Sequence, residues 1–338
     1  MPELVSILIP AYNAERWLRQ TVRSCLAQTW PRCEIVIVDD GSTDRTFEIA
    51  RTCACGSVNV VTQPNGGASV ARNTAFALAQ GTFIQWLDAD DLVDAEKIAR
   101  QMAVAREVSD PRIALSGQFG TFYHRPEKAT FVRTSLWRDL TPLEYFLIRF
   151  NENVYFQTDA WLVSRELTEA AGPWSEDSPD DDGEYFCRLI ARSRGIRFVD
   201  GARTYYRTGL ETSLHVKRSK EALDALFLSK AKCIRYLLSL EESARTRRAS
   251  IQLLQDWLPY FHPEHPDLVE RVRQLVRELG GELNLPRLKW KYRSIEWLFG
   301  PPSAAMLSRI FPTLRSRIAA EWDRSLQAFA SSKTPRRS

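Results

Sequence analysis

Short apolar runs alternate with amphipathic segments over the first 110 residues, and this alternation constrains the fold more than any other feature. Runs typical of buried strands lie at residues 5–9, 34–38, 58–62 and 83–87. Apolar positions at helical spacing occupy residues 15–28, 44–50, 68–79 and 95–108. Because the connections between them are short, we predict an α/β fold with parallel strand pairing and right-handed crossovers.

Acidic side chains follow two of these predicted strands. Asp88, Asp90 and Asp91 come directly after the run 83–87, and Asp39 and Asp40 close the run that begins at Glu34. Ligands of such sheets bind outside the carboxyl ends of the strands. Carboxylates gathered there repel one another and are usually held by a cation, and hard oxygen ligands suit Mg²⁺ or Mn²⁺. The sequence therefore predicts a metal site that leaves positions open for substrate phosphates.

The end of the first strand argues against two common nucleotide-binding folds. No G-x-G-x-x-G follows it, and no G-x-x-x-x-G-K-[ST] occurs in the chain. Tyr12 stands there instead and can stack on a planar base, unless it is a half-buried core aromatic. Arg72 follows the flexible turn Asn65–Gly67 and suits a phosphate or a ribose, unless it is a surface arginine.

Composition limits the class of protein and its partners. The 338 residues carry a formal net charge of +4, which is too small to indicate a nucleic-acid partner. From Gly281 onward there are 11 Lys and Arg against 4 Asp and Glu, so the basic excess is C-terminal. The six cysteines have no C-x-x-C or zinc-site spacing, and we expect reduced thiols. We also expect neither a signal peptide nor a spanning helix, and hence a cytoplasmic location.

Four segments resemble the successive motifs of family 2 glycosyltransferases with the GT-A fold. They are Ile9–Asn13, Val38–Asp44, Asn65–Asn73 and Trp86–Leu92, in the family's order and spacing. The resemblance covers about residues 4–215 and is clearest in the first 100. It implies a mixed, mostly parallel sheet flanked by helices, a nucleotide-sugar donor, Mg²⁺ or Mn²⁺, and transfer with inversion. It further implies synthesis of a cell-surface polysaccharide or glycolipid; UDP is the commonest donor base, while GDP and dTDP also occur.

The resemblance assigns roles to residues at the strand ends. It implies that Asp90 and Asp91 hold the metal. It implies nucleotide-sugar binding by Pro10, Ala11, Tyr12, Asn13, Asp39, Asp40, Gly41, Gly67, Arg72, Asp88 and Ala89. Asp88 would face the ribose or the metal.

A further carboxylate must accept the proton of the acceptor hydroxyl as it attacks the anomeric carbon. Family members commonly carry a Glu-Asp pair at the head of a helix, with Arg-Leu six residues after the Asp. Aligned on Arg188-Leu189, the pair becomes Asp181-Asp182, with Asp in place of Glu, and Asp182 takes the role of base. Asp180 and Asp181 are alternative registers. Acids that stabilise a helix dipole, or a solvated surface cluster, are the competing structural interpretations.

Other site residues are expected in the second half of the catalytic region. Arg207, Ser213 and His215 are candidates for contacts with the diphosphate, and His215 is a less favoured metal ligand. Trp161, like Trp174, flanks the expected site and suits the apolar face of an acceptor sugar, although tryptophan more often lies in a core.

We predict a GT-A catalytic domain over residues 1–215, divided into a nucleotide-binding half (1–110) and an acceptor-binding half (111–215). A C-terminal helical region should follow at 216–330, with a disordered tail at 331–338. In the acceptor-binding half we expect strands at 119–131, 159–164, 196–199 and 203–207 and a helix at 141–149. In the C-terminal region we expect helices at 220–239, 247–258 and 267–279.

The C-terminal region and the catalytic assignment each have an alternative. Residues 288–299 interleave basic with aromatic side chains, which favours contact with an anionic membrane surface or a role as lid or homodimer surface. A nucleotidyltransferase would carry a glycine-rich loop after the first strand. A non-catalytic regulator with the same fold would bind sugar nucleotides without turnover; Asp at position 181 favours it slightly, whereas the intact metal and base positions oppose it.

Overall fold

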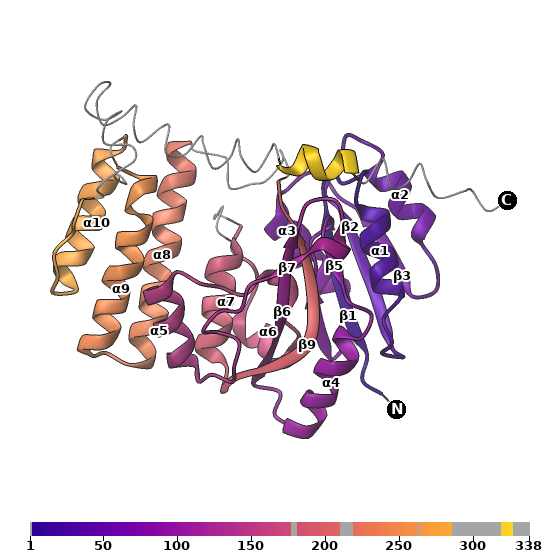
Figure 1. Ribbon diagram of the computed structural model, residues 1–338, viewed down its shortest axis with the longest axis horizontal. Coiled ribbons are helices and arrows are strands. Elements are labelled where there is room, and N and C mark those ends of the chain that lie inside the picture. Colours follow the sequence, from indigo (N-terminus) through magenta and orange to yellow (C-terminus); the bar gives the residue numbers. More distant parts are fainter. Residues whose placement is uncertain (1, 177–180, 210–218, 263, 286–318, 327–338) are drawn as a thin grey trace.

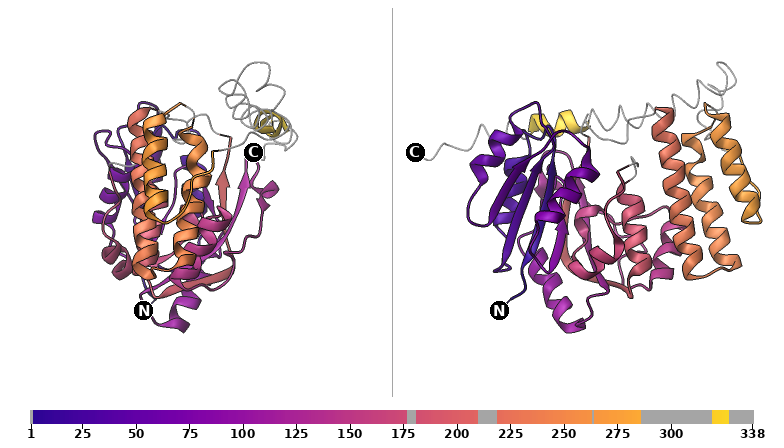
Figure 2. Two further views of the ribbon diagram at one scale, coloured as in Figure 1. Left: turned by 90° about the vertical axis from the view of Figure 1, so that its left-hand side faces the viewer. Right: turned by 180° about the vertical axis from the view of Figure 1, so that it is seen from behind.

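The computed structural model describes residues 2–176, 181–209, 219–262, 264–285 and 319–326 (Figure 1). Two sheets with helices packed around them form one part of the molecule. Helices α8, α9 and α10 stand side by side at one end of it (Figures 1 and 2).

The first sheet has the strand order β3-β2-β1-β4-β8. Its strands are β1 (Val5–Ala11), β2 (Cys33–Asp39), β3 (Val58–Thr62), β4 (Phe83–Trp86) and β8 (Val163–Ser164). β1 to β4 pair in parallel, whereas β8 is antiparallel to β4. The predicted parallel pairing is therefore confirmed for the four runs of the first 110 residues.

Helices cover both faces of this sheet, which explains why its strands are apolar on both sides. Helices α1 (Leu18–Leu26), α2 (Thr46–Cys53) and α4 (Lys97–Val108) share one core with Ile7 and Ile37. On the other face, α3 (Ala68–Leu78) and α6 (Arg165–Ala171) pack with Leu8 and Val38. α1 begins three residues later than predicted, because residues 13–15 are hydrogen-bonded to residues 42–46.

The second sheet has the order β5-β9-β6-β7 and corrects two expectations. Its strands are β5 (Leu92–Val93), β6 (Ile113–Phe122), β7 (Thr130–Phe131) and β9 (Gly195–Arg207). β9 is one strand rather than the predicted pair, because residues 200–202 bulge out of its parallel ladder with β6. β6 begins six residues before the predicted strand. The strand predicted at 159–164 is reduced to β8, since residues 158–160 form a 3₁₀ helix.

The predicted C-terminal helices are confirmed to within a few residues. They are α8 (Lys220–Leu240), α9 (Ala244–Trp257) and α10 (Pro266–Glu278), and the 3₁₀ turn η4 (Leu258–Tyr260) follows α9. α8 and α9 pack against α5 (Pro142–Glu152), and α8 also packs against α7 (Asp181–Arg192). α10 packs on α8 and α9, and the apolar side chains of all three helices continue the core on the α3 side of the first sheet.

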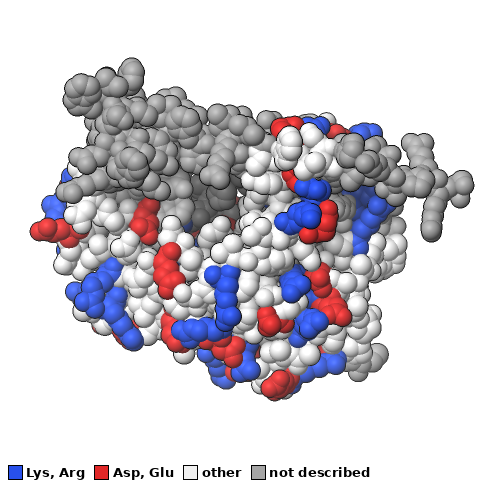
Figure 3. Space-filling view, in the orientation of Figure 1, with Lys and Arg blue, Asp and Glu red and all other residues white. Residues whose placement is uncertain are grey.

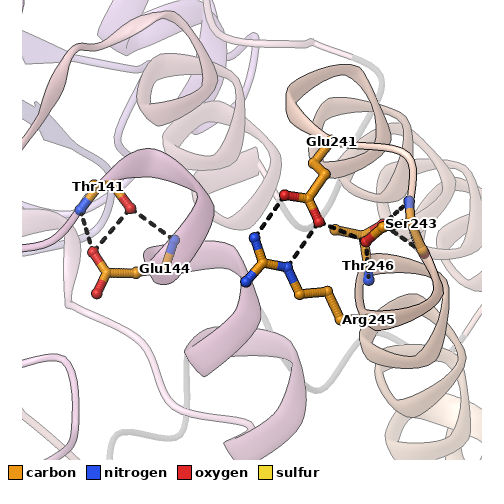
Figure 4. A network of polar contacts seen from close by, with 6 residues as sticks. All are labelled: Thr141, Glu144, Glu241, Ser243, Arg245 and Thr246. Carbon is orange, nitrogen blue, oxygen red and sulfur yellow. Dashed lines mark hydrogen bonds and ion pairs between the residues drawn. The ribbon is translucent and has the colours of Figure 1, made fainter.

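The starts of α5 and α9 are both closed by capping boxes (Figure 4). The Thr141 hydroxyl accepts from the backbone N–H of Glu144, whose carboxylate accepts from the backbone N–H of Thr141. Ser243 and Thr246 make the same exchange at α9, where Glu241 also pairs with Arg245. Each box satisfies backbone donors that a helix start leaves unpaired, so the beginnings of both helices are well determined.

Residues 319–326 form a short helix that lies against the loop after β6 (Figure 1). The carboxylate of Asp323 accepts from the backbone N–H groups of His124 and Arg125 and pairs with the Arg125 guanidinium at 2.6 Å. The predicted basic segment 288–299 and the tail 331–338 lie outside the described residues.

Basic and acidic side chains of the described residues are interspersed on the face drawn in Figure 3. Surface ion pairs such as Arg138–Glu144 and Arg245–Glu241 place opposite charges next to each other. All six cysteines are free thiols, as expected from their spacing. Within the described residues, no helix is long and apolar enough to cross a membrane.

Candidate functional site

The ends of β1, β2 and β4 meet at one edge of the first sheet. Ala11 pairs with Asp39 across the β1–β2 ladder, and Leu8 pairs with Trp86 across β1–β4. Tyr12 therefore follows β1 next to the acidic end of β2, and its side chain is 52% exposed. A core position for Tyr12 is excluded, and its ring is open to a ligand.

The two acids that end β2 have different environments. The Asp40 carboxylate accepts from Gln63 Nε2 at 2.8 Å, Asn65 Nδ2 at 3.2 Å and the backbone N–H groups of Gly66 and Gly67 at 2.9 and 2.8 Å. Asp40 thus holds the turn before α3 in place.

Asp39 is less completely satisfied. Its Oδ2 accepts from the Thr62 hydroxyl at 2.9 Å, while its buried Oδ1 has no hydrogen-bond partner among the described residues. A buried acceptor without a donor is costly, so Asp39 is the acid of this pair that retains an acceptor for a ligand N–H.

Asn13 and Gly41 shape the loops around Tyr12. Asn13 Oδ1 accepts from the backbone N–H of Thr43 at 2.9 Å, and its own N–H donates to Ser42 Oγ at 3.0 Å. Gly41 has a φ of +69°, and a Cβ on it would lie 2.8 Å from the backbone nitrogen of Asn65. Both residues therefore serve the geometry of the site through the backbone.

We expect Gly41→Ala to destabilise the protein by more than Gly56→Ala does. A Cβ on Gly56 meets nothing within 4 Å, and its φ is not in the positive range that disfavours a side chain. Only Gly41→Ala bears the left-handed backbone penalty of about 1–2 kcal/mol, and it adds a collision with backbone. Urea unfolding of the two variants measures the difference; equal losses would show that the turn yields at Gly41.

Arg72 reaches the acidic end of β4 from α3. Its guanidinium donates to Asp88 Oδ1 at 2.8 Å and lies 4.4 Å from the ring centroid of Trp174. Arg72 is buried, whereas the Asp88 side chain is 36% exposed. Arg72 is therefore not the surface arginine of the alternative interpretation, and it places a cation beside the predicted nucleotide.

Asp90 and Asp91 are tied to the end of β9 by Arg207. The backbone N–H of Arg207 donates to Asp91 Oδ1 at 2.7 Å, and its Nε donates to the carbonyl of Asp90 at 2.8 Å. Its guanidinium lies 4.0 Å from the ring centroid of Trp17. Arg207 thus joins both sheets at the acidic motif, which is where a contact with the diphosphate was predicted.

The acids of this motif are poorly stabilised as anions. Burial raises the pKa of Asp90 to about 6, and the nearby charge of Asp88 contributes to the rise. Burial also raises the pKa of Asp91 well above its usual range, with further contributions from Asp90, Asp159 and Asp88. A bound cation would reverse this electrostatic effect.

The donor set fits a hard divalent cation completed by its substrate. Among the described residues, no group of three His, Cys, Asp or Glu side chains is gathered into a metal site. Asp88 and Asp90 nevertheless offer oxygen ligands, and Mg²⁺ sites commonly use one or two carboxylates plus substrate phosphates and water. Asp91 is more enclosed, and its role as a ligand stays a prediction. Ser213 and His215 lie outside the described residues.

Asp182 lies in the first turn of α7, where its Oδ1 accepts from the N–H of Gly183 at 2.7 Å. Glu184 in the same turn accepts from Arg188 Nε at 2.9 Å and from the Tyr236 hydroxyl of α8 at 2.7 Å. Arg188 also donates to the carbonyls of Ala171 and Pro173. The arginine that set the sequence alignment is thus the residue that fixes this helix start. Asp181 opens α7, and Asp180 lies outside the described residues.

Two aromatic connections join the acidic motif to α7. Arg72, paired with Asp88, lies over Trp174, and Trp174 stacks on Tyr185 of α7 with ring centroids 3.9 Å apart. On the other side stand Tyr206 and Tyr155. Burial raises the pKa of both phenols; charges at Asp91 and Asp88 raise that of Tyr206 further, and the charge of Asp182 raises that of Tyr155.

Residues 6–171 match the family model described as glycosyl transferase family 2. This region of the chain belongs to that family. The uncharacterized glycosyltransferase EpsJ of Bacillus subtilis is 36% identical over 193 residues, which are 53% of this chain and 55% of EpsJ. The chain spans about half the length of the curated relatives it matches, between 41% and 55% for the first three.

Solved structures confirm the GT-A fold of this family 2 region. S. aureus TarS 1-349 in complex with UDP has a TM-score of 0.59 at 18% identity, covering 81% of this chain and 83% of TarS 1-349. The mannosyltransferase PcManGT of Pyrobaculum calidifontis, in complex with GDP-Man and Mn²⁺, has a TM-score of 0.55 at 18% identity, covering 96% and 88%. At this identity the likeness establishes the fold alone.

The predicted acceptor contact at Trp161 is wrong in the structure of this family 2 region. Trp161 is fully buried, and its ring stacks on Phe186 of α7 with centroids 5.3 Å apart. Trp174 is also buried. Both tryptophans belong to the core between the first sheet and α7, so neither offers a ring face to a sugar.

A buried polar cluster beneath the acidic motif was missed. Lys97 Nζ donates to Gln101 Oε1 at 2.9 Å and to Gln85, and burial lowers its pKa to about 7. Burial raises the pKa of nearby Asp159 to about 7. Lysine and glutamine in an amphipathic helix normally indicate a solvated face. Only the contact between Lys97 of α4 and Gln85 of β4 shows that these side chains are buried together.

Proposed function

We propose that this chain transfers a sugar from a nucleotide-sugar donor to an acceptor hydroxyl with inversion. One observation carries the proposal: Tyr12, Asp39 and the Asp88–Asp91 motif meet at one sheet edge. The start of α7, which carries Asp182, is linked to this motif through Tyr155 and Tyr206, whose pKa values are raised by burial and further by the charges of Asp182 and of Asp91 and Asp88, respectively. The complexes of TarS with UDP and of PcManGT with GDP-Man and Mn²⁺ support a donor of this class and a divalent cation. Among donor bases we propose UDP first.

The residues divide into a donor side and an acceptor side. The exposed ring of Tyr12 can stack on the base, and the free oxygen of Asp39 can accept a base N–H. Arg72 and Arg207 keep the acidic motif in position and provide positive charge near the phosphates. A divalent cation held by Asp88, Asp90 and Asp91 would supply Lewis-acid stabilisation of the departing diphosphate.

Asp182 performs the proton transfer in this proposal. As the acceptor oxygen forms its bond to the anomeric carbon, the hydroxyl proton passes to the Asp182 carboxylate. The bond from the anomeric carbon to the diphosphate oxygen breaks on the opposite side, and the nucleoside diphosphate leaves. A single displacement of this kind inverts the configuration. Holding both reactants in line contributes the proximity effect.

A panel of nucleotide sugars with Mn²⁺ tests the proposal in two steps. Thermal-shift measurements should identify at least one donor that raises the melting temperature, because a ligand bound only to the folded state stabilises it. Incubation with that donor should then release free sugar slowly, since a transferase without acceptor uses water. A donor that binds without any hydrolysis would favour the non-catalytic regulator, and stabilisation by no member of the panel would contradict the proposal.

The acceptor, proposed as part of a cell-surface polysaccharide or glycolipid, is a separate question. Cytoplasmic location, peripheral membrane contact through residues 288–299 and a homodimer remain predictions that accompany this function.

A further inference from the structure

A row of aromatic rings runs from the acidic motif past Asp182 onto the C-terminal helices. Tyr206 of β9 and Phe119 of β6 lie on the same face of the second sheet, because Phe119 pairs with Thr204 and Thr121 with Tyr206 in a parallel ladder. Tyr155 stacks on Phe119 with ring centroids 6.1 Å apart and planes 18° apart. Tyr260 and Trp257 continue the row beyond α9.

Tyr155 stands between the predicted base and the C-terminal helices. Tyr155 follows α5, and α5 packs along α9, which ends at Trp257. The pKa of Tyr155 is raised chiefly by burial, and the charges of Asp182 and Tyr260 raise it further. The side chain is nevertheless 48% exposed. One face packs on Phe119, and the remaining surface of the ring is open to solvent beside the base.

The second ring pair is held by α8, which also contacts the start of α7. Cys233 of α8 contacts the carbonyl of Gly183, the residue after Asp182, at 3.8 Å. Lys230 lies three residues earlier on α8, about 4.5 Å along its axis, and its Nζ is 3.8 Å from the ring centroid of Trp257. Trp257 in turn stacks on Tyr260 with centroids 4.8 Å apart. Tyr260 is 46% exposed, so this pair also presents a ring to solvent.

We propose that Tyr155, Tyr260 and Trp257 form a platform that binds a saccharide chain of the acceptor, with one sugar at Tyr155 and the next at Tyr260. This inference rests on the proposed function and specifies its acceptor as at least a disaccharide unit. Rigid aromatic rings with a polar hydroxyl edge suit a ligand whose sugar rings have apolar faces and hydroxyl rims. The position of the platform next to Asp182 would bring the terminal hydroxyl of the chain to the base.

A role in core packing alone does not explain the exposure of Tyr155 and Tyr260. Trp161, Trp174 and Tyr185 illustrate packing aromatics in this protein, and each is almost completely buried. Tyr155 and Tyr260 keep about half of their surfaces in water although each already has a stacked partner. Exposed apolar surface next to a reaction centre is typical of a binding site.

Binding of neutral oligosaccharides to the full chain, without donor, tests this inference. The probes are cellotetraose, maltotetraose and chitotetraose, each compared by calorimetry and saturation-transfer NMR with its monosaccharide. We expect at least one tetrasaccharide to bind at least tenfold more tightly than its monosaccharide. Tyr260→Ala should weaken that binding by about three- to tenfold, the value of one stacked ring. Tyr260→Phe should retain it, because the ring face makes the contact.

Matched controls separate binding from folding. Trp322→Ala removes an aromatic side chain that is 70% exposed on the helix 319–326, and it should leave tetrasaccharide binding unchanged. Equal affinity for tetrasaccharide and monosaccharide throughout the panel would overturn the inference, as would wild-type affinity in the Tyr155→Ala/Tyr260→Ala double variant. Nucleotide binding with Mn²⁺ is measured in parallel. Failure of the proposed function would appear as a loss of nucleotide binding, whereas failure of the platform would appear only in the oligosaccharide titrations.

Discussion

Replacing Asp90 by alanine is expected to abolish Mn²⁺-dependent binding of the nucleotide-sugar donor. Asp90 and Asp88 are the more accessible oxygen donors of the motif, and Arg207 reaches only the backbone carbonyl of Asp90. Loss of supporting residues around a metal commonly weakens its binding 10- to 100-fold, so loss of a ligand should cost at least about 100-fold in donor affinity. Calorimetric titration of donor with and without Mn²⁺ measures the effect; an unchanged Mn²⁺-dependent titration would refute the assignment.

The same variant should not lose stability in the absence of metal. The pKa of Asp90 is raised to about 6 by burial and then by Asp88, so at neutral pH the folded state holds a carboxylate whose charge is unfavourable there. A group with a raised folded-state pKa lowers stability as the pH rises through the interval from 3.8 to 6, and its removal eliminates that cost. Asp90→Ala should therefore melt at the same or a higher temperature than the wild type without metal.

Asp267→Ala provides the control. It removes a surface carboxylate, paired with Lys220, from the start of α10. Donor affinity and its dependence on Mn²⁺ should both match the wild type in this variant. A loss in Asp90→Ala accompanied by a lower melting temperature would point to misfolding rather than to a missing ligand.

The edge of the first sheet could be predicted because it depends on local patterns. Apolar runs, helical spacing and the acids after Val38 and Leu87 determine parallel strands whose ends meet, and the structure places Tyr12, Asp40 and Asp88 together accordingly. The division of labour between Asp39 and Asp40 could not be predicted. It depends on the path of the turn 63–67, whose four donors converge on Asp40 through contacts between distant residues.

Tertiary packing also determines the environments of the residues whose roles the sequence predicted wrongly or missed. Trp161 follows a 3₁₀ turn that points its ring into the core against α7, and nothing in its local sequence distinguishes this from an exposed aromatic. Lys97 occupies a helix position that would normally be solvated, and its glutamine partners lie on β4 and one turn along α4. No local sequence pattern marks Tyr155 or Tyr260 as site residues. Their relation to Asp182 arises only when α7, α8 and α9 pack together.

Asp182→Asn should lower turnover at least about 100-fold, at the low end of what a general base contributes. The substitution removes basicity and changes the shape of the side chain very little. Asp182 Oδ1 accepts from the N–H of Gly183 at 2.7 Å, and the carbonyl oxygen of an asparagine can accept the same bond. The start of α7 is also held independently by Glu184, Arg188 and Tyr236, so the helix should remain in place.

The expected signature is a loss of turnover without a loss of binding. Affinity for the donor with Mn²⁺ should stay within about twofold of the wild type, because Asp182 belongs to the acceptor side and uniform binding is unaffected. Asn variants at Asp180 and Asp181 resolve the register: each should retain most of its turnover if Asp182 is the base. Near-normal turnover in Asp182→Asn, with the loss in Asp181→Asn instead, would move the base by one residue along α7. Near-normal turnover in all three would remove this acidic cluster from the mechanism.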